Sequence, residues 1–147
     1  MVSLSSSIPL VIICSIIFAI ICGFVVTYWY ISTILDPSDP TIKEQRECEA
    51  RYERFNGEKY EFMCEICQTH VLNSAKHCGA CNRCVNDFDH HCRWINNCVG
   101  SKNYVQFFRL IVAAFFMTLM HNITNGFVIY FFMTNSTNVL EQQMFVY

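Results

Sequence analysis

CEICQTHVLNSAKHCGACNRCVNDFDHHCRWINNC, the stretch from Cys64 to Cys98, decides the fold of this chain. It holds seven cysteines and four histidines, and it includes the run Asp89-His90-His91-Cys92. Two tetrahedral zinc sites need eight cysteine or histidine ligands. The stretch supplies more than these eight, and the residues left over include a cysteine and a histidine, which a purely structural zinc module would not require.

Charged residues divide the rest of the chain into three parts. None occurs from Met1 to Leu35, all ten basic residues fall between Lys43 and Arg109, and only Glu141 follows. The apolar runs 8–35 and 107–133 are both longer than the roughly 20 residues that cross a bilayer as a helix. A cleaved signal peptide would have a basic start and a shorter apolar core. The sequence therefore predicts two transmembrane helices.

The basic residues also predict the orientation, because they favour the cytoplasmic side of a membrane. We expect residues 36–106 in the cytosol, with 36–63 as a juxtamembrane linker. Segments 1–7 and 134–147 then lie on the lumenal or outer side. The net charge of −2 gives no reason to expect a nucleic-acid partner. Nothing distinguishes the Golgi, the endoplasmic reticulum and the plasma membrane.

A cytosolic location makes metal binding a better explanation of the cysteines than disulfides. The cytosolic part is small and poor in aliphatic residues, so bound zinc would supply stability that its core lacks. Cys-x2-Cys spacings occur at 64/67, 78/81 and 81/84. Spacing alone leaves Cys84 open, because it pairs as well with Cys81 as with a more distant ligand.

Local patterns give a coarse secondary structure. Asp36-Pro37 ends the first long helix, because proline disfavours helical geometry in the residue before it. A short helix is predicted from Lys43 to Phe55, and a hairpin beginning near Tyr60. His70 is expected at the surface. The polar residues in the middle of the second apolar run are expected to bond to a neighbouring helix; they are His121, Asn122, Thr124 and Asn125.

The block from Cys64 to Tyr104 resembles the cysteine-rich domain of DHHC-type protein S-acyltransferases, the palmitoyltransferases. The resemblance includes Asn96-Asn97-Cys98-Val99-Gly100 and Asn103-Tyr104. Asp36-Pro37 also resembles the Asp-Pro-Gly element of that family, with Ser38 where glycine is usual. The resemblance implies a mainly α membrane protein. Two transmembrane helices would flank a small zinc domain, 64–104, with short hairpins.

The resemblance also implies which residues bind metal. One structural Zn²⁺ would be held by Cys64, Cys67, His77 and Cys84. The second would be held by Cys78, Cys81, His91 and Cys98. Both sites would be closed Cys3His sites, which is typical of structural zinc rather than catalytic zinc.

Asp89, His90 and Cys92 remain, and their chemistry suits covalent catalysis. A thiolate is the reactive form of cysteine, a histidine can take its proton, and a carboxylate can orient that histidine. We therefore expect Cys92 as the nucleophile, His90 as the general base and Asp89 as the orienting group. By resemblance, Cys92 takes a palmitoyl group from acyl-CoA and passes it to cysteine thiols of cytosolic or membrane-associated proteins.

Departures from the family pattern leave alternatives open. Arg93 stands where proline is commoner, and the family usually has four membrane helices where this chain has two. We therefore expect a fragment, whose activity alone is an open question. A catalytically inactive, membrane-anchored zinc-binding interaction module produced by truncation is the alternative function. A RING-like adaptor is disfavoured, because its ligands are spaced more widely than His77-Cys78-x2-Cys81-x2-Cys84.

Overall fold

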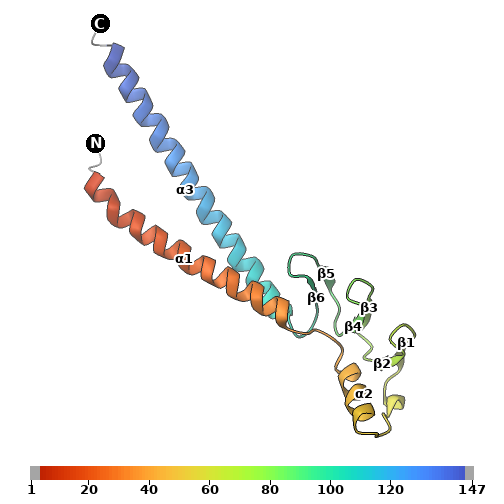
Figure 1. Ribbon diagram of the computed structural model, residues 1–147. Helices are drawn as coiled ribbons and strands as arrows, with labels where there is room; N and C mark the ends of the chain where they lie inside the picture. The colour runs from red at the N-terminus through yellow and green to blue at the C-terminus, as the bar shows by residue number, and fades with distance from the viewer. Residues whose placement is uncertain (1–3, 145–147) are drawn as a thin grey trace. The chain divides into compact units, whose positions relative to one another are not determined.

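The computed structural model describes residues 4–144, and Figure 1 shows the order of its elements. The chain divides into two units. The hairpin unit, Val26–Leu110, contains the end of helix α1, helix α2, a 3-10 turn η1, the strands β1 to β6 and the start of helix α3. The helical unit consists of the remaining parts of α1 and α3.

Helices α1 (Leu4–Ile34) and α3 (Tyr104–Met144) flank the strands in the sequence. Within them, Pro9–Ile34 has a mean hydropathy of 3.0 and Tyr104–Thr134 one of 1.5. Both stretches are long and apolar enough to cross a membrane by length and composition. Helix α1 ends at Ile34, so the predicted stop ahead of the Asp36-Pro37 pair is confirmed.

Both long helices extend past the apolar limits at which the predicted spans 8–35 and 107–133 were drawn. Helix α1 starts at Leu4 and helix α3 continues to Met144, so the two helices include most of the segments 1–7 and 134–147 that were expected outside the membrane. Residues 1–3 and 145–147 of those segments lie outside the described residues. Once a helix has formed, each added residue contributes a further hydrogen bond, so polar residues can prolong it beyond its apolar part.

The polar side chains in the middle of α3 bond within their own helix. The amide of Asn122 and the hydroxyl of Thr124 each donate to a carbonyl one turn back, at 2.7 and 3.0 Å. The side-chain nitrogens of His121 and Asn125 lie 2.9 Å apart. The predicted helix–helix hydrogen bonds of these four side chains are not found in the described part of the chain. Carbonyls of the preceding turn provide closer partners.

Helix α2 runs over Pro40–Ala50, where the sequence predicted Lys43–Phe55. Asp39 caps it, because its Oδ1 accepts a hydrogen bond from the Thr41 N–H at 2.9 Å. The proline that follows the cap has no N–H to leave unpaired and is favoured at this position. Tyr52, just beyond the helix, takes a left-handed φ of 58°. The helix was predicted to start too late because the Asp39 cap was not recognised, and to end too late because the turn at Tyr52 was not recognised.

Replacing Asp39 with alanine is expected to destabilise the hairpin unit by about 2 kcal/mol. Asp39 is 1% exposed, and its second oxygen accepts the Leu72 N–H at 3.2 Å, which ties the start of α2 to the chain at Leu72. Hydrogen exchange of the α2 amides measures the effect. Glu61→Ala removes an exposed carboxylate and is the control, with less than about 0.5 kcal/mol expected. Equal exchange in both variants would contradict the role of the cap.

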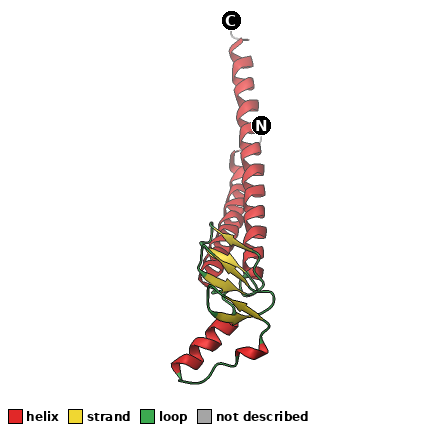
Figure 2. Cartoon of the chain, turned by 90° about the vertical axis from the view of Figure 1, so that its right-hand side faces the viewer, coloured by secondary structure: helices red, strands yellow, loops and turns green. Residues whose placement is uncertain are grey.

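Six three-residue strands form three separate antiparallel hairpins (Figure 2). Hairpin 1 pairs β1 (Phe62–Cys64) with β2 (Thr69–Val71), hairpin 2 pairs β3 (Lys76–Cys78) with β4 (Arg83–Val85), and hairpin 3 pairs β5 (His90–Cys92) with β6 (Asn97–Val99). A two-stranded hairpin is marginally stable in water by itself. These hairpins therefore need links to one another.

Most of the buried apolar residues of the hairpin unit form two small clusters that each contain cysteine. The first consists of Cys78, Val85 and Cys98, with Cys81 and Phe88 half-buried beside them. The second consists of Cys92, Ile95 and Val99, with Phe107 and Leu110 half-buried beside them. Clusters of this size bury little apolar surface, so cross-links through metal ions have a large share of the stability to provide.

Candidate metal centres and reactive cysteine

Strand geometry directs the adjacent residues His77 and Cys78 to different places. Within hairpin 2, His77 lies opposite Cys84 and Cys78 lies opposite Arg83. Successive side chains of a strand point to opposite faces. His77 and Cys84 therefore face one neighbouring hairpin, and Cys78 faces the other.

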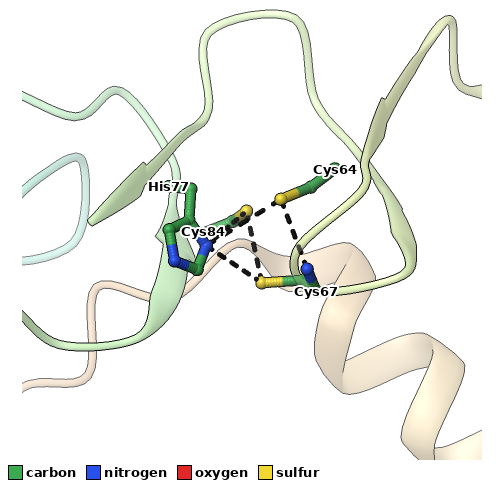
Figure 3. A group of neighbouring side chains, drawn as sticks. All are labelled: Cys64, Cys67, His77 and Cys84. Carbon is green, nitrogen blue, oxygen red and sulfur yellow. Dashed lines mark hydrogen bonds between the residues drawn. The ribbon is translucent and has the colours of Figure 1, made fainter. Parts of the chain in front are cut away.

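The first group of metal-binding side chains joins hairpins 1 and 2 (Figure 3). Its members are Cys64, Cys67, His77 and Cys84, whose ligand atoms all lie within 4.8 Å of one another. The Nδ1 atom of His77 is 3.3 Å from the Sγ of Cys67 and 3.8 Å from the Sγ of Cys64. The Sγ atoms of Cys84 and Cys67 are 3.6 Å apart.

The second group joins hairpins 2 and 3 in the same way. Its members are Cys78, Cys81, His91 and Cys98, again with all ligand atoms within 4.8 Å. The Nδ1 atom of His91 is 3.3 Å from the Sγ of Cys81 and 3.8 Å from the Sγ of Cys98. Hairpin 2 thus contributes to both groups, one on each of its faces.

Both groups fit Zn²⁺. Zinc–sulfur bonds of about 2.3 Å in a tetrahedron place neighbouring donor atoms about 3.5–3.8 Å apart. The donor atoms of the first group are 3.3 to 3.9 Å apart where they are in contact. Three sulfurs and one imidazole complete the tetrahedron, so no position is left for water or substrate. This donor set is typical of a structural site.

The raised pKa of one buried thiol in each group also favours a cation there. Burial, and then the two neighbouring sulfurs of its group, raise the pKa of the Cys84 thiol above its ordinary value. The same causes raise the pKa of the Cys98 thiol. Thiolates crowded together in this way repel one another. A divalent cation removes that repulsion and allows the coordinating thiols to lose their protons.

Cys92 lies outside both groups. In hairpin 3, His91 faces Cys98 in register, so the strand alternation points His90 and Cys92 to the opposite face. Cys92 is 7% exposed and packs against Ile95, in the second apolar cluster. Its sulfur is therefore the one sulfur of hairpin 3 that faces away from a metal group.

His90 is placed between a carboxylate and an aromatic ring. Its Nδ1 lies 3.3 Å from the Oδ2 of Asp89, and its ring meets that of Phe107 edge-on at a centroid distance of 5.4 Å. The Asp89 N–H donates to the carbonyl of Val99 at 3.0 Å, which fixes the backbone of Asp89 to strand β6. A carboxylate at Nδ1 orients the ring and leaves Nε2 as the second ring nitrogen for proton exchange.

The comparison with known proteins identifies the family. The model of the DHHC palmitoyltransferase family matches residues 57–147, more than half of the chain. The chain belongs to the DHHC palmitoyltransferase family. The predicted family membership is thereby confirmed.

Curated proteins from a plant, an insect and a yeast are similar to this DHHC chain. The probable protein S-acyltransferase 20 of Arabidopsis thaliana is 38% identical over 73 residues, 50% of this chain and 10% of that protein. Palmitoyltransferase ZDHHC8 of Drosophila melanogaster is 32% identical over 103 residues, 64% of this chain and 11% of that protein. Palmitoyltransferase SWF1 of Saccharomyces cerevisiae is 47% identical over 53 residues, 36% of this chain and 16% of that protein. The chain therefore spans only a small part of the length of these relatives.

The DHHC chain brings its sequence-predicted site residues together as groups. The two sets of four predicted zinc ligands are the two groups described above, and Asp89, His90 and Cys92 lie on or beside strand β5. Their roles stay predictions. His70, expected at the surface, is half-buried instead: its Nδ1 lies 3.3 Å from the carbonyl of Tyr60, because strand β2 packs beside the chain that leads into β1.

Sequence reasoning named Asn97 within the block that resembles the family but gave it no role. In the structure, Asn97 holds hairpin 3 against the end of α1. Its Nδ2 lies 3.1 Å from the carbonyl of Ser32 and 2.8 Å from that of Leu35. Its Oδ1 accepts from the Cys98 N–H at 2.9 Å and from Arg83 at 2.7 Å. The signals in the sequence are that Asn97 belongs to the family-like run 96–100 and precedes a metal ligand, and neither predicts partners more than 60 residues away.

Asn103 has a similar role at the start of α3. Its Nδ2 donates to the carbonyl of Cys98 at 2.8 Å and lies 3.3 Å from that of Ser32, and its Oδ1 accepts the Gly100 N–H at 2.9 Å. The two asparagines thus provide donors to the last carbonyls of α1, which have no partners within their own helix. They position the hairpin that carries Cys92.

Proposed function

We propose that this chain is the catalytic segment of a protein S-acyltransferase, which transfers a long-chain acyl group from acyl-CoA to cysteine thiols of other proteins. The observation that carries the proposal is the position of Cys92. Two groups of four ligands account for the other cysteines of the hairpins, while Cys92 faces away from them on the same strand face as His90. Family membership supplies the reaction class.

The first step forms an acyl-enzyme. His90 takes the proton of the Cys92 thiol, and the thiolate attacks the carbonyl carbon of the acyl-CoA thioester. A new C–S bond to Cys92 forms, the C–S bond to CoA breaks, and CoA leaves as a thiolate that takes up the proton. Asp89 at Nδ1 holds the imidazole in the orientation this transfer needs and stabilises its charged form.

The second step repeats the exchange in the other direction. The thiolate of a substrate protein attacks the acyl-enzyme, and Cys92 leaves as a thiolate. One thioester replaces another in both steps, so the reaction is nearly balanced in energy and depends on positioning. The apolar surroundings of Cys92, Ile95 and Phe107 among them, suit an acyl chain that enters from a bilayer.

The metal ions have a structural role in this proposal. Zn²⁺ in each Cys3His group would link two hairpins and supply folding free energy, as closed sites do. An ion in the second group would link hairpin 3 to hairpin 2, and would therefore hold in place the strand that carries the proposed nucleophile. No open metal position takes part in the chemistry.

The membrane arrangement follows from the two apolar stretches and the basic residues. We infer that α1 and α3 cross a bilayer and that the hairpin unit lies on the cytosolic side. CoA is soluble and its acyl chain prefers the bilayer, so a nucleophile at the cytosolic surface meets both parts of the substrate. We therefore propose a mainly α membrane protein. Segments 8–35 and 107–133 span the membrane, and segment 64–104 forms the zinc domain.

The chain in lipid nanodiscs, loaded with zinc and given labelled palmitoyl-CoA, is expected to form a hydroxylamine-sensitive adduct. Cys92→Ser should remove this adduct, because serine at that position lacks the thiolate. Cys48→Ser is the matched control, since Cys48 is a half-buried cysteine of α2 outside both metal groups, and its adduct should be unchanged. Label retained in Cys92→Ser would show that Cys92 is not the nucleophile. No label in the parent chain would favour an inactive zinc-binding interaction module.

A further inference from the structure

The three hairpins repeat at an interval of 14 residues. Their first strands end at Cys64, Cys78 and Cys92, and their second strands end at Val71, Val85 and Val99. Each hairpin therefore has a three-residue strand ending in cysteine, a four-residue turn and a three-residue strand ending in valine. The pairing register is the same in all three.

The turns share one backbone conformation. Gln68, Asn82 and Asn96 occupy the last turn position and have φ values of 51°, 48° and 47°. Left-handed φ is uncommon for residues other than glycine. Its occurrence at one equivalent position of each hairpin indicates that the three turns have the same shape.

The side chain before this left-handed residue distinguishes hairpin 3 from the other two. It is Cys67 in hairpin 1 and Cys81 in hairpin 2, the second metal-binding cysteine in both cases. In hairpin 3 it is Ile95, which is 1% exposed and packs against Cys92 and Val99. Cys92 thus has the position of a first metal-binding cysteine, and an aliphatic side chain occupies the position of the second.

The remaining ligands of each metal group come from the next hairpin. They follow the first cysteine by 13 and 20 residues, as His77 and Cys84 follow Cys64. The same offsets from Cys92 lead to Val105 and Val112 in α3, which offer no ligand atom. By this comparison, a third metal group would need four ligands. Cys92 stands at the first position, and the apolar residues Ile95, Val105 and Val112 stand at the other three.

We propose that hairpin 3 is a metal-binding knuckle with a single remaining ligand, and that Ile95 is the positioning residue that keeps metal off Cys92. The turn would give Cys92 the fixed orientation of a zinc ligand while its sulfur stays free to react. The importance of a metal-free Cys92 for acyl transfer rests on the proposed function. The metal-binding geometry of hairpin 3 does not depend on that function.

The test is Ile95→Cys in the full zinc-loaded chain, which restores the Cys-x2-Cys pair of hairpins 1 and 2. Free Zn²⁺ should then slow alkylation of Cys92 by about tenfold or more, since a metal-bound thiolate is a poor nucleophile. Ile95→Ser is the control, because serine is similar in size to cysteine but has no thiolate. Zinc should leave the alkylation of Cys92 in this variant unchanged. A mass-spectrometric count of label on Cys92 gives the rate.

Two results would overturn the proposal. One is an Ile95→Cys chain that keeps two zinc ions but shows the same Cys92 alkylation with and without free zinc. The second is an Ile95→Cys chain that loses its zinc ions, because the equivalent turns of hairpins 1 and 2 accept cysteine at this position. The readout is independent of acyl transfer, so failure of the adduct assay and failure of this test are distinguishable.

Discussion

Cys78→Ser is expected to release zinc and unfold the hairpin unit, whereas Cys92→Ser is expected to keep two zinc ions per chain. The two cysteines occupy equivalent positions in consecutive hairpins, and they are both buried. They differ in their partners, since three other ligand atoms surround Cys78 within 4.8 Å and Cys92 belongs to neither group. The pair is therefore a matched comparison of a ligand with a free thiol.

The size of the effect follows from the small core of the hairpin unit. Structural zinc contributes an apparent 10–16 kcal/mol in small zinc domains, and most domains have a total stability of about 5–15 kcal/mol. Loss of one of four ligands should remove much of that contribution. Zinc content after gel filtration and amide exchange of the strands measure the result. Equal zinc loss in both variants would show that the assignment of Cys78 as ligand and Cys92 as free thiol is wrong.

The parts of this site that sequence could predict are those in which residue type and spacing determine the chemistry. The Cys-x2-Cys pairs and the surplus of Cys92 were visible in the sequence, but spacing left Cys84 open. The strand register explains its place, because Cys84 lies opposite His77 and points away from Cys78. Three-residue strands have too little periodicity for such alternation to be read from a sequence.

Other features depend on contacts between distant segments. Asp39 and Asn97 are ordinary polar residues until their partners at Leu72 and in α1 are known. The 14-residue repeat was present in the sequence but concealed, because Ile95 replaces a cysteine at one of the three equivalent positions. The turn conformation shared by the hairpins makes the equivalence plain.

Asn97→Asp is expected to loosen hairpin 3 from the end of α1, with a loss of about 3 kcal/mol. Asn97 is 3% exposed, and its amide group faces the carbonyls of Ser32, Thr33 and Leu35. Aspartate keeps the oxygen that accepts from the Cys98 N–H, but it brings a second, charged oxygen against those carbonyls. A buried polar group without a partner costs about 1–3 kcal/mol, and a charged one costs more.

A loss of this size corresponds to an increase of roughly a hundredfold in the rate at which a chelator removes zinc, if opening of the hairpin unit limits release. Asn73→Asp is the control, because Asn73 is exposed and its amide contacts only the Glu61 carboxylate, at 3.3 Å, among the described contacts. Its zinc release should change less than about threefold. Since hairpin 3 carries both Cys92 and two zinc ligands, Asn97→Asp should also slow formation of the acyl adduct. Unchanged zinc release in Asn97→Asp would mean that the metal ion of the second group holds hairpin 3 in place without help from Asn97.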